Sequence, residues 1–392
     1  MRRRTLTRFV LILLLIEFLD EFVFGAREAA WPLIRDDLGL TYAQIGLFLT
    51  VPALVANVIE PFLAILGDVW RRRVIVLGGG LAFTLALALT AASQTPAVLL
   101  LAFILLYPAS GAFVSLSQAT LMDLDEPRRE HNMARWTLAG SVGVVLGPLA
   151  LGLGLMLGVG WRGVMAAMAG LSFALLMLSL PMPFHGGHTG ARLSVAAVGR
   201  GLLDAVRALK RRVVLRWLIL LEFSDLMLDV LLGLLALYLV DVGGATPQQA
   251  SLGVAVWVGV GLVGDFALIP LLERVRGLRY LRLSALISLA LFPLMLLAPE
   301  FWQKVVLLGL IGFFNAGWYA ILQAQLYATL PGQSGTALAV KNLSGIVASV
   351  IPLALGLVAQ RWGLNAAMWL LLAGPLALVI GLIGERTEAA IE

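Results

Sequence analysis

Long apolar runs recur along nearly the whole chain and are separated by short polar segments. Each run is close to the roughly 20 residues that an α-helix needs to cross the hydrocarbon core of a bilayer. The hydrophobicity is continuous rather than alternating, which favours helices over the strands of a membrane barrel. We therefore predict an all-α membrane protein with about twelve transmembrane helices, at residues 9–33, 41–66, 74–93, 97–121, 134–158, 161–181, 214–240, 247–271, 282–298, 303–328, 335–359 and 364–384.

The two halves of the chain carry the same polar residues at the same spacing. A shift of 205 residues places Glu17 on Glu222 and Asp20 on Asp225 without a gap. Apolar coincidences are common in such a chain, but a long ungapped series of polar matches is not. We predict two pseudo-symmetric six-helix bundles, 1–181 and 214–392, joined by a linker at 182–213. The same shift also pairs Asp36 with Asp241, Thr41 with Thr246, Gln44 with Gln249, Glu60 with Asp265, Asp68 with Glu273, Arg71 with Arg276 and Gln118 with Gln323.

Composition supports membrane insertion and the charge indicates orientation. Hydrophobic residues make up 60% of the chain and charged residues 13%, whereas about a quarter of a soluble domain is charged. The net charge is +5, but the basic residues lie in short loops, as the positive-inside rule expects, so no nucleic-acid partner is implied. Of the 28 Lys and Arg residues, 23 fall on the side of the N-terminus. We expect a multi-pass protein of the cytoplasmic (inner) membrane with both termini cytoplasmic.

The linker and the missing cysteines limit the possible chemistry. With no Cys in the chain, disulfides, thiol nucleophiles and Cys-based metal sites are excluded. His185 and His188 lie in a Gly-rich turn and are interpreted as solvated, so neither a metal site nor a cofactor is expected. Residues 193–212 have helical spacing with a cationic face, which predicts a helix lying at the membrane interface. We expect a monomer whose partners are the lipid bilayer and its substrate.

Carboxylates inside the first two spans of each half are the main candidates for function. A charge within a span costs several kcal/mol and is a functional hypothesis by default. Glu17 and Asp20 share one helix face, as do Glu222 and Asp225 in the other half. Glu60 should lie level with Glu17 on the antiparallel second span, and the same argument applies to Asp265. These positions predict one carboxylate cluster in each half, whereas Glu21 and Asp229 suit either a cavity or an interhelical hydrogen bond and Glu28 suits an ion pair with Arg27.

Such clusters have two ways of avoiding repulsion. Crowded carboxylates away from water can share protons, and their titrations are then coupled. Alternatively, a bound cation can neutralise them. A carrier in which protons and a cationic substrate compete for the same acids would be an antiporter, and this is the mechanism that we favour.

Several motifs resemble those of the major facilitator superfamily of secondary transporters. The loop Ala64-Ile-Leu-Gly67-Asp68-Val-Trp-Arg71-Arg72-Arg73 is similar to the family sequence G-x-x-x-D-R-x-G-R-R after the second span, and keeps its acid and two of the basic positions. Gly143-x-x-x-Gly147-Pro148 with Gly152 resembles the glycine-proline motif of the family's exporters. The fourth span departs from the pattern, because Tyr107 stands where many proton-coupled members carry arginine. The six-plus-six arrangement and the parallel repeat also match this family.

The resemblance implies a central cavity and an inner gate. In the family the cavity is lined by spans 1, 4, 7 and 10, which here supply Tyr107, Gln118, Asn315, Trp318, Tyr319 and Gln323 beside the acids. Aromatic rings near acids suit organic cations, although Trp and Tyr also simply pack and the two Gln residues suit interhelical hydrogen bonds. The loop acids brace the opposite half in the family, which implies contacts of Asp68 with Lys341 and of Glu273 with Arg135, with Arg72 in the same gate.

The sequence therefore predicts a secondary active transporter, and not an enzyme. We expect it to work by alternating access and to export a cationic or zwitterionic small molecule in exchange for protons. A divalent metal carrier is the alternative within transport, since oxygen-rich clusters suit hard cations. A lipid scramblase is the alternative from another class.

Overall fold

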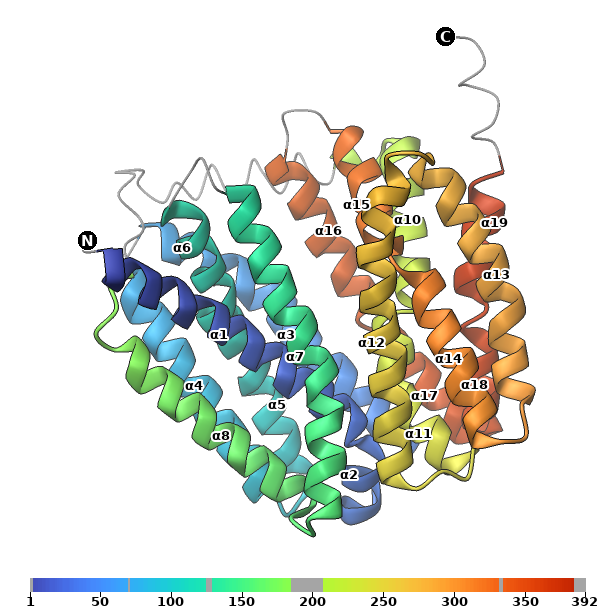
Figure 1. The fold of residues 1–392 in the computed structure, drawn as a ribbon, viewed down its shortest axis with the longest axis horizontal. Helices are drawn as coiled ribbons and strands as arrows, with labels where there is room; N and C mark the ends of the chain where they lie inside the picture. Colours follow the sequence, from blue (N-terminus) through green and yellow to red (C-terminus); the bar gives the residue numbers. More distant parts are fainter. Residues whose placement is uncertain (1–2, 70, 125–128, 185–206, 331–333, 384–392) are drawn as a thin grey trace. The chain divides into compact units, whose positions relative to one another are not determined.

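The computed structural model describes residues 3–69, 71–124, 129–184, 207–330 and 334–383 (Figure 1). Within these residues the secondary structure is helical, which confirms the predicted fold class. The chain divides into two compact units, Met1–Ser194 and Val195–Glu392. This division falls inside the predicted linker. His185, His188 and most of the predicted interfacial helix lie outside the described residues.

All six predicted spans of the N-terminal unit contain helix. Most are single helices, but the fourth is interrupted by a π-helical turn. The elements are α1 (Arg3–Ala29), α2 (Trp31–Leu38), α3 (Tyr42–Val69), α4 (Arg72–Ala92), α5 (Pro96–Ser110), η1 (Gly111–Ser115), α6 (Leu116–Leu124), α7 (Arg129–Met156) and α8 (Gly160–Ser179).

The C-terminal unit also contains helix in all six predicted spans, and four of these spans are broken in two. The elements are α10 (Arg212–Asp225), α11 (Asp229–Asp241), α12 (Pro247–Leu272), α13 (Gly277–Leu297), α14 (Phe301–Asn315), α15 (Trp318–Ala328), α16 (Ser334–Ala348), α17 (Ile351–Trp362), α18 (Leu364–Leu370) and α19 (Ala373–Gly381). Breaks of this kind are tolerated in a membrane only where other groups bond the freed backbone.

Ten helices in the described part are long and apolar enough to cross a membrane. The two predicted spans outside this set are those that carry most of the acids. Helix α1 holds five charged residues between Glu17 and Glu28. Helices α10 and α11 have only 14 and 13 residues because the span is broken beside Asp225. The two spans that are too charged or too short to belong to this set, α1 and α10–α11, are therefore the ones that carry most of the candidate acids.

The end of the first span differs from its predicted position. The first span was expected to continue to residue 33, but α1 ends at Ala29 and a separate short helix, α2, begins at Trp31. Pro32 explains the new start, because a residue without an N–H group fits the first turn of a helix and not its interior.

The internal repeat is visible in the way the second span of each half begins. The Thr41 N–H donates to Gln44 Oε1 at 2.8 Å, and the Gln44 N–H donates to Thr41 Oγ1 at 3.2 Å. Thr246 and Gln249 form the same pair of bonds at 2.9 and 3.2 Å. These are capping boxes, in which two free N–H groups of a helix start are satisfied reciprocally. The repeated Thr and Gln residues therefore have a structural explanation.

Glycines let α1 and α7 pack side by side (Figure 1). A Cβ at Gly143 would collide with the carbonyl oxygen of Phe18, and one at Gly147 would lie 2.5 Å from the Phe22 carbonyl oxygen. The glycine-proline motif of the fifth span is thus the surface on which the acid-bearing first helix rests. Close approach through small residues is a common mode of helix association in membranes.

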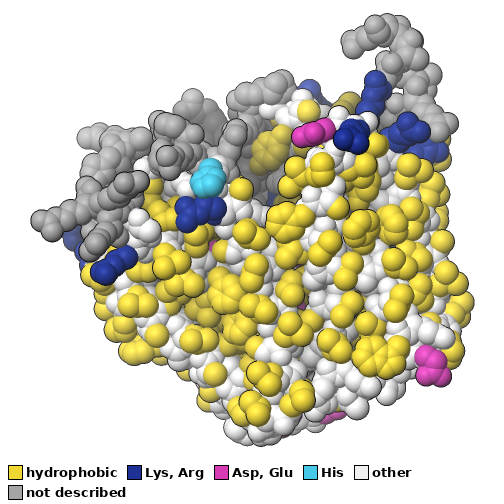
Figure 2. Space-filling view, in the orientation of Figure 1, with side chains coloured by type: hydrophobic (Ala, Val, Ile, Leu, Met, Phe, Trp, Pro, Cys, Tyr) yellow, Lys and Arg dark blue, Asp and Glu magenta, His cyan; other side chains and the backbone are white. Residues whose placement is uncertain are grey.

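The visible surface fits a bilayer environment. Figure 2 shows hydrophobic side chains over the middle of the helices, with charged side chains gathered near the helix ends. Large apolar residues such as Phe62, Leu153 and Ile269 are more than half exposed. Exposure of this extent is expected where lipid, rather than water, is the solvent.

Candidate functional site

Glu17 lies between α1 and α7 in the N-terminal unit. Its carboxylate accepts a hydrogen bond from the Trp136 side chain of α7. Gly140, one turn along α7, is so close that a Cβ there would lie 2.6 Å from Glu17 Oε1. The absence of a side chain at Gly140 therefore makes room for the acid. Sequence reasoning missed both α7 residues.

Asp20 is the centre of the acidic group in this unit. It accepts a hydrogen bond from Ser110 Oγ of α5 at 3.0 Å. Electrostatic repulsion links it to Glu17 on its own helix and to Glu60 on α3. Arg27 attracts it from two turns further along α1. The structure thus brings together the three acids that the repeat and the depth argument singled out in this half.

Glu60 packs against the irregular part of the fourth span. A Cβ at Gly111 would lie 2.6 Å from Glu60 Cγ, so the side chain of Glu60 occupies the space that a side chain at Gly111 would need. Gly111 begins the π-helical turn η1, three residues after Pro108. π-helical turns are rare and are frequently found at functional sites.

The buried ion pair at Arg27 is structural, as expected. Arg27 Nη2 lies 2.5 Å from Glu28 Oε1, and both side chains are buried. Trp31 Nε1 donates to the other oxygen of Glu28 at 2.8 Å. The Arg27 guanidinium lies 4.9 Å from the ring centroid of Tyr107. Tyr107, which was predicted to line the cavity, therefore makes a cation–π contact with Arg27.

The acids of the C-terminal unit have different neighbours. Ser344 Oγ of α16 donates to Glu222, and Lys341 on the same helix attracts both Glu222 and Asp225. Asp225 is also repelled by Asp229, which follows the break between α10 and α11. This group of acids is therefore faced by an ammonium, whereas Glu17 is faced by an indole.

Lys341 also contacts Tyr319. Its Nζ donates to the Tyr319 hydroxyl and lies 4.7 Å from the ring centroid. Together with Glu222 and Asp225, the Tyr319 ring forms an environment that holds a primary ammonium group.

Asp265 of α12 interacts with the backbone of the tenth span. Asp265 interacts with Gly317 and Tyr280, and Glu222 interacts with Ser344, Lys341 and Asp225. Asp265 Oδ1 accepts the N–H of Gly317 at 2.9 Å, where the tenth span is broken. The expected placement of Asp265 level with Glu222 stays a prediction.

Two residues predicted to line the cavity are buried and hydrogen-bonded within the C-terminal unit. Asn315 is buried, accepts a hydrogen bond from Ser288 Oγ at 2.8 Å and donates to the Met227 carbonyl at 3.0 Å. Trp318 is fully buried and donates to Ser284 Oγ at 2.8 Å. Gln118 donates to Met133 Sδ at 3.7 Å, and Gln323 is half-buried.

Part of the predicted gate is defined within the N-terminal unit. Arg72 is buried, and its Nη1 lies 2.7 Å from Asp123 Oδ2 at the end of the fourth span. The side chain of Asp68 lies outside the described residues. Arg135 and Glu273 are exposed. The contacts of Asp68 with Lys341 and of Glu273 with Arg135 would join the two halves and stay predictions.

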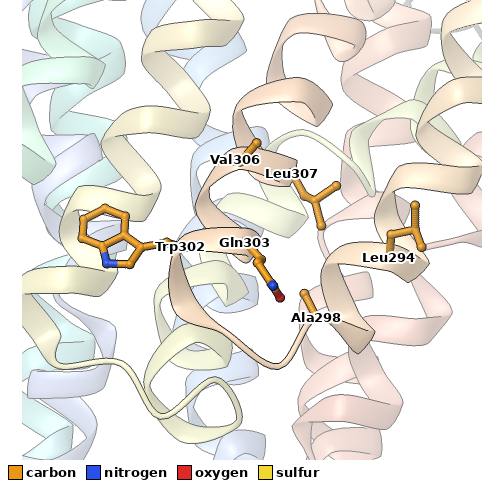
Figure 3. Close-up of a pocket in the computed structure, with 6 residues that line it drawn as sticks. All are labelled: Leu294, Ala298, Trp302, Gln303, Val306 and Leu307. Atoms are coloured by element: carbon orange, nitrogen blue, oxygen red, sulfur yellow. The ribbon is translucent and has the colours of Figure 1, made fainter.

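A hollow of about 550 Å³ lies at the α13–α14 corner (Figure 3). Its lining is almost entirely apolar, and the polar exception, Gln303, belongs to the capping box of α14. In Figure 3 the Trp302 side chain points away from the other lining residues. The hollow holds none of the candidate acids. Within the described part of the chain, no three His, Cys, Asp or Glu side chains lie close enough together to hold a metal ion.

Comparisons with known proteins agree with the architecture. A family model described as Major Facilitator Superfamily matches residues 10–343. The fold is similar to that of a bacterial homologue of the human lysosomal transporter Spinster, with a TM-score of 0.74, 14% identity and coverage of 98% of this chain and 95% of that one. It is also similar to the nucleoside transporter NupG, with a TM-score of 0.75, 15% identity and coverage of 97% and 99%. No curated protein sequence matches significantly.

Proposed function

Because this chain belongs to the major facilitator superfamily and is therefore a membrane transporter rather than an enzyme, we propose that it exchanges protons for a cationic or zwitterionic small molecule. The exchange uses the acids Glu17, Asp20, Glu60, Glu222 and Asp225. Transport proceeds by alternating access, as in other carriers with parallel repeats. The protein acts as a monomer in the cytoplasmic membrane.

The observation that carries this proposal is the position of Asp20. Glu17 and Glu60 repel it, and Ser110 donates one neutral hydrogen bond to it. Arg27 attracts it, but this guanidinium already forms an ion pair with Glu28. Uncompensated charges are costly in an apolar setting. Protons or a bound cation would neutralise this group, and a site that accepts either one couples their movements.

The chemistry of the substrate is inferred from the C-terminal unit. There the ammonium of Lys341 interacts with the ring of Tyr319 and with two carboxylates. An organic amine has the same requirements, namely an aromatic face and a negative charge. We infer that Lys341 occupies a cation position that a substrate amine can take when the lysine moves aside.

The direction of transport rests on the motif in the fifth span. Gly143, Gly147 and Pro148 resemble the exporter motif, and they hold α7 against the acid-bearing α1. We propose export on this basis. One of the similar structures is a nucleoside transporter, so nucleosides belong among the compounds in a substrate screen.

Ligand-dependent melting of the purified protein tests the proposal. We expect organic amines to raise the melting temperature more at pH 8 than at pH 6, because protons compete for the same carboxylates. A paired change of Glu17→Gln and Glu222→Gln should remove this response. Asp36→Asn is the matched control, because Asp36 is also a repeated acid but is 66% exposed in a surface ion pair.

The same assay separates the alternatives. Stabilisation by Mn²⁺ or Mg²⁺ and not by amines would favour the divalent metal carrier. Movement of fluorescent lipid in proteoliposomes, without a response to any cation, would favour a scramblase. An unchanged amine response in the double variant would contradict the carboxylate site.

A further inference from the structure

The tenth span is broken at one place, between α14 and α15, and side chains of neighbouring helices bond three of the backbone groups there. Helix α14 ends at Asn315, and α15 begins at Trp318. Gly317 between them has φ of 72°, a left-handed conformation that favours glycine. The break is therefore an ordered feature of the fold and not a frayed helix end.

Two neighbouring helices supply these partners, and a side chain of α14 extends the network to a second break. Asp265 of α12 accepts the Gly317 N–H at 2.9 Å. The Tyr280 hydroxyl of α13 donates to the Ala316 carbonyl at 3.2 Å and lies 3.5 Å from the Phe314 carbonyl. Asn315 donates to the carbonyl of Met227, which lies in the break of the seventh span. Two breaks of the C-terminal unit are thus linked by one side chain.

Helices α12 and α14 pack closely beside the break because Gly264 has no side chain. A Cβ at Gly264, next to Asp265, would lie 2.7 Å from the Phe313 carbonyl oxygen. The second and fourth spans of this half therefore touch through their backbones beside the break. Of the groups at this contact, the Asp265 carboxylate is the one that carries a charge.

The N-terminal unit has a related arrangement at the equivalent positions. The shift of 205 residues takes Glu60 to Asp265 and Gly111 to Ala316. Glu60 packs against Gly111, where the fourth span passes into its π-helical turn. In both halves, the acid of the second span lies at the point where the fourth span departs from a regular α-helix. The same relationship is thus present in both units of the repeat.

We propose that Asp265 is a positioning residue, the charged latch of a hinge at Ala316–Gly317, and not a ligand of the substrate. Its carboxylate holds the start of α15, to which negative charge is attracted by the helix dipole. Neutralisation of Asp265 weakens this hydrogen bond. Helix α15, which carries Tyr319, is then free to change its angle to α14. The latch does not depend on which compound is carried, so its failure would leave the proposed function standing.

Amide hydrogen exchange at single-residue resolution, on the full-length protein in lipid nanodiscs, tests the latch. We expect Asp265→Leu to raise the exchange rate of the Gly317 amide by at least about tenfold, because a hydrogen bond to a charged group is lost. Asp265→Asn keeps an acceptor at the same position and should stay within roughly threefold of the unchanged protein. This rescue separates the hydrogen bond from the mere size of the side chain.

A second carboxylate cap on the same span provides the control. Glu300 accepts the backbone N–H of Gln303 at the start of α14. Glu300→Leu should raise exchange at Gln303 and leave Gly317 unchanged. The latch is refuted if Asp265→Leu leaves the Gly317 rate unchanged, if it raises exchange equally along α12, α14 and α15, or if Asp265→Asn exchanges as fast as Asp265→Leu.

Discussion

Trp136 and Lys341 occupy the same position in the two halves of the repeat, and each faces the glutamate of the first helix of its own half. The numbers 136 and 341 differ by 205, as do 17 and 222. Trp136 donates a hydrogen bond to Glu17, whereas Lys341 attracts Glu222 through its charge. The electrostatic balance of the two related groups therefore differs, since an ammonium faces the glutamate in the C-terminal half where an indole faces it in the N-terminal half.

Removal of the lysine should expose the cation site of the C-terminal unit. Lys341→Met keeps an unbranched side chain that is one atom shorter and removes the ammonium that faces Glu222 and Asp225. We expect tetraphenylphosphonium to bind about tenfold more tightly, a change of roughly 1.4 kcal/mol. Equilibrium binding to the purified protein measures this. Arg274→Met removes an exposed charge and should leave the affinity unchanged, and equal affinity in both variants would contradict the tethered-cation interpretation.

The converse change should neutralise the N-terminal group. Trp136→Lys places an ammonium opposite Glu17, in imitation of the other half. We expect the difference in amine stabilisation between pH 6 and pH 8 to fall by roughly half or more, because attraction at short range favours the charged carboxylate. Trp136→Phe is the control, since it removes the N–H donor and adds no charge. If the lysine variant keeps the full difference, the acids around Asp20 do not exchange protons with the substrate.

Much of the architecture could be predicted because it depends on local pattern. Long apolar runs determine the spans, and the ungapped polar matches identify the repeat. Thr41 and Gln44 were visible as a repeated pair, and their capping box explains why those two residue types recur. The ion pair of Arg27 with Glu28 was also predictable, because adjacent opposite charges in an apolar segment have few other ways to be compensated.

The partners of the acids could not be predicted in the same way. Trp136 is one of ten tryptophans, and only the packing of α7 on α1 makes it a donor to Glu17. Asp265 was placed by depth along the membrane, which does not determine the helix it faces. The π-helical turn and the breaks depend on tertiary hydrogen bonds, such as that of Tyr280 with Ala316, which leave no periodic signal.

The contact between α1 and α7 should be sensitive to a single methyl group. A Cβ at Gly143 would collide with the Phe18 backbone and lie 3.0 Å from the Phe22 nitrogen. We expect Gly143→Ala to destabilise the protein by about 1–3 kcal/mol, as is typical of overpacking. Gly170→Ala in α8 is the control, because nothing lies within 4 Å of that position. Thermal melting compares the two, and equal melting temperatures would show that the helices can separate without cost.

The two capping boxes should contribute equally if the halves are structurally equivalent. Thr41→Ala and Thr246→Ala each remove one side-chain acceptor at a helix start, with bonds of 3.2 Å in both cases. We expect each to cost about 0.5–2 kcal/mol. Thr41→Ser and Thr246→Ser keep the hydroxyl and should restore most of the stability. A large difference between the two alanine variants would show that the halves unfold independently with unequal stability.

The orientation in the membrane can be tested directly because the chain contains no cysteine. Gln94, in the turn between α4 and α5, and Arg274, after α12, are both exposed. The predicted topology places them on opposite sides of the membrane. The positive-inside bias places Arg274 on the cytoplasmic side. In intact cells, a membrane-impermeant maleimide should therefore label Gln94→Cys at once and Arg274→Cys only after permeabilisation. The opposite labelling pattern would invert the topology and, with it, the side from which protons reach Glu17.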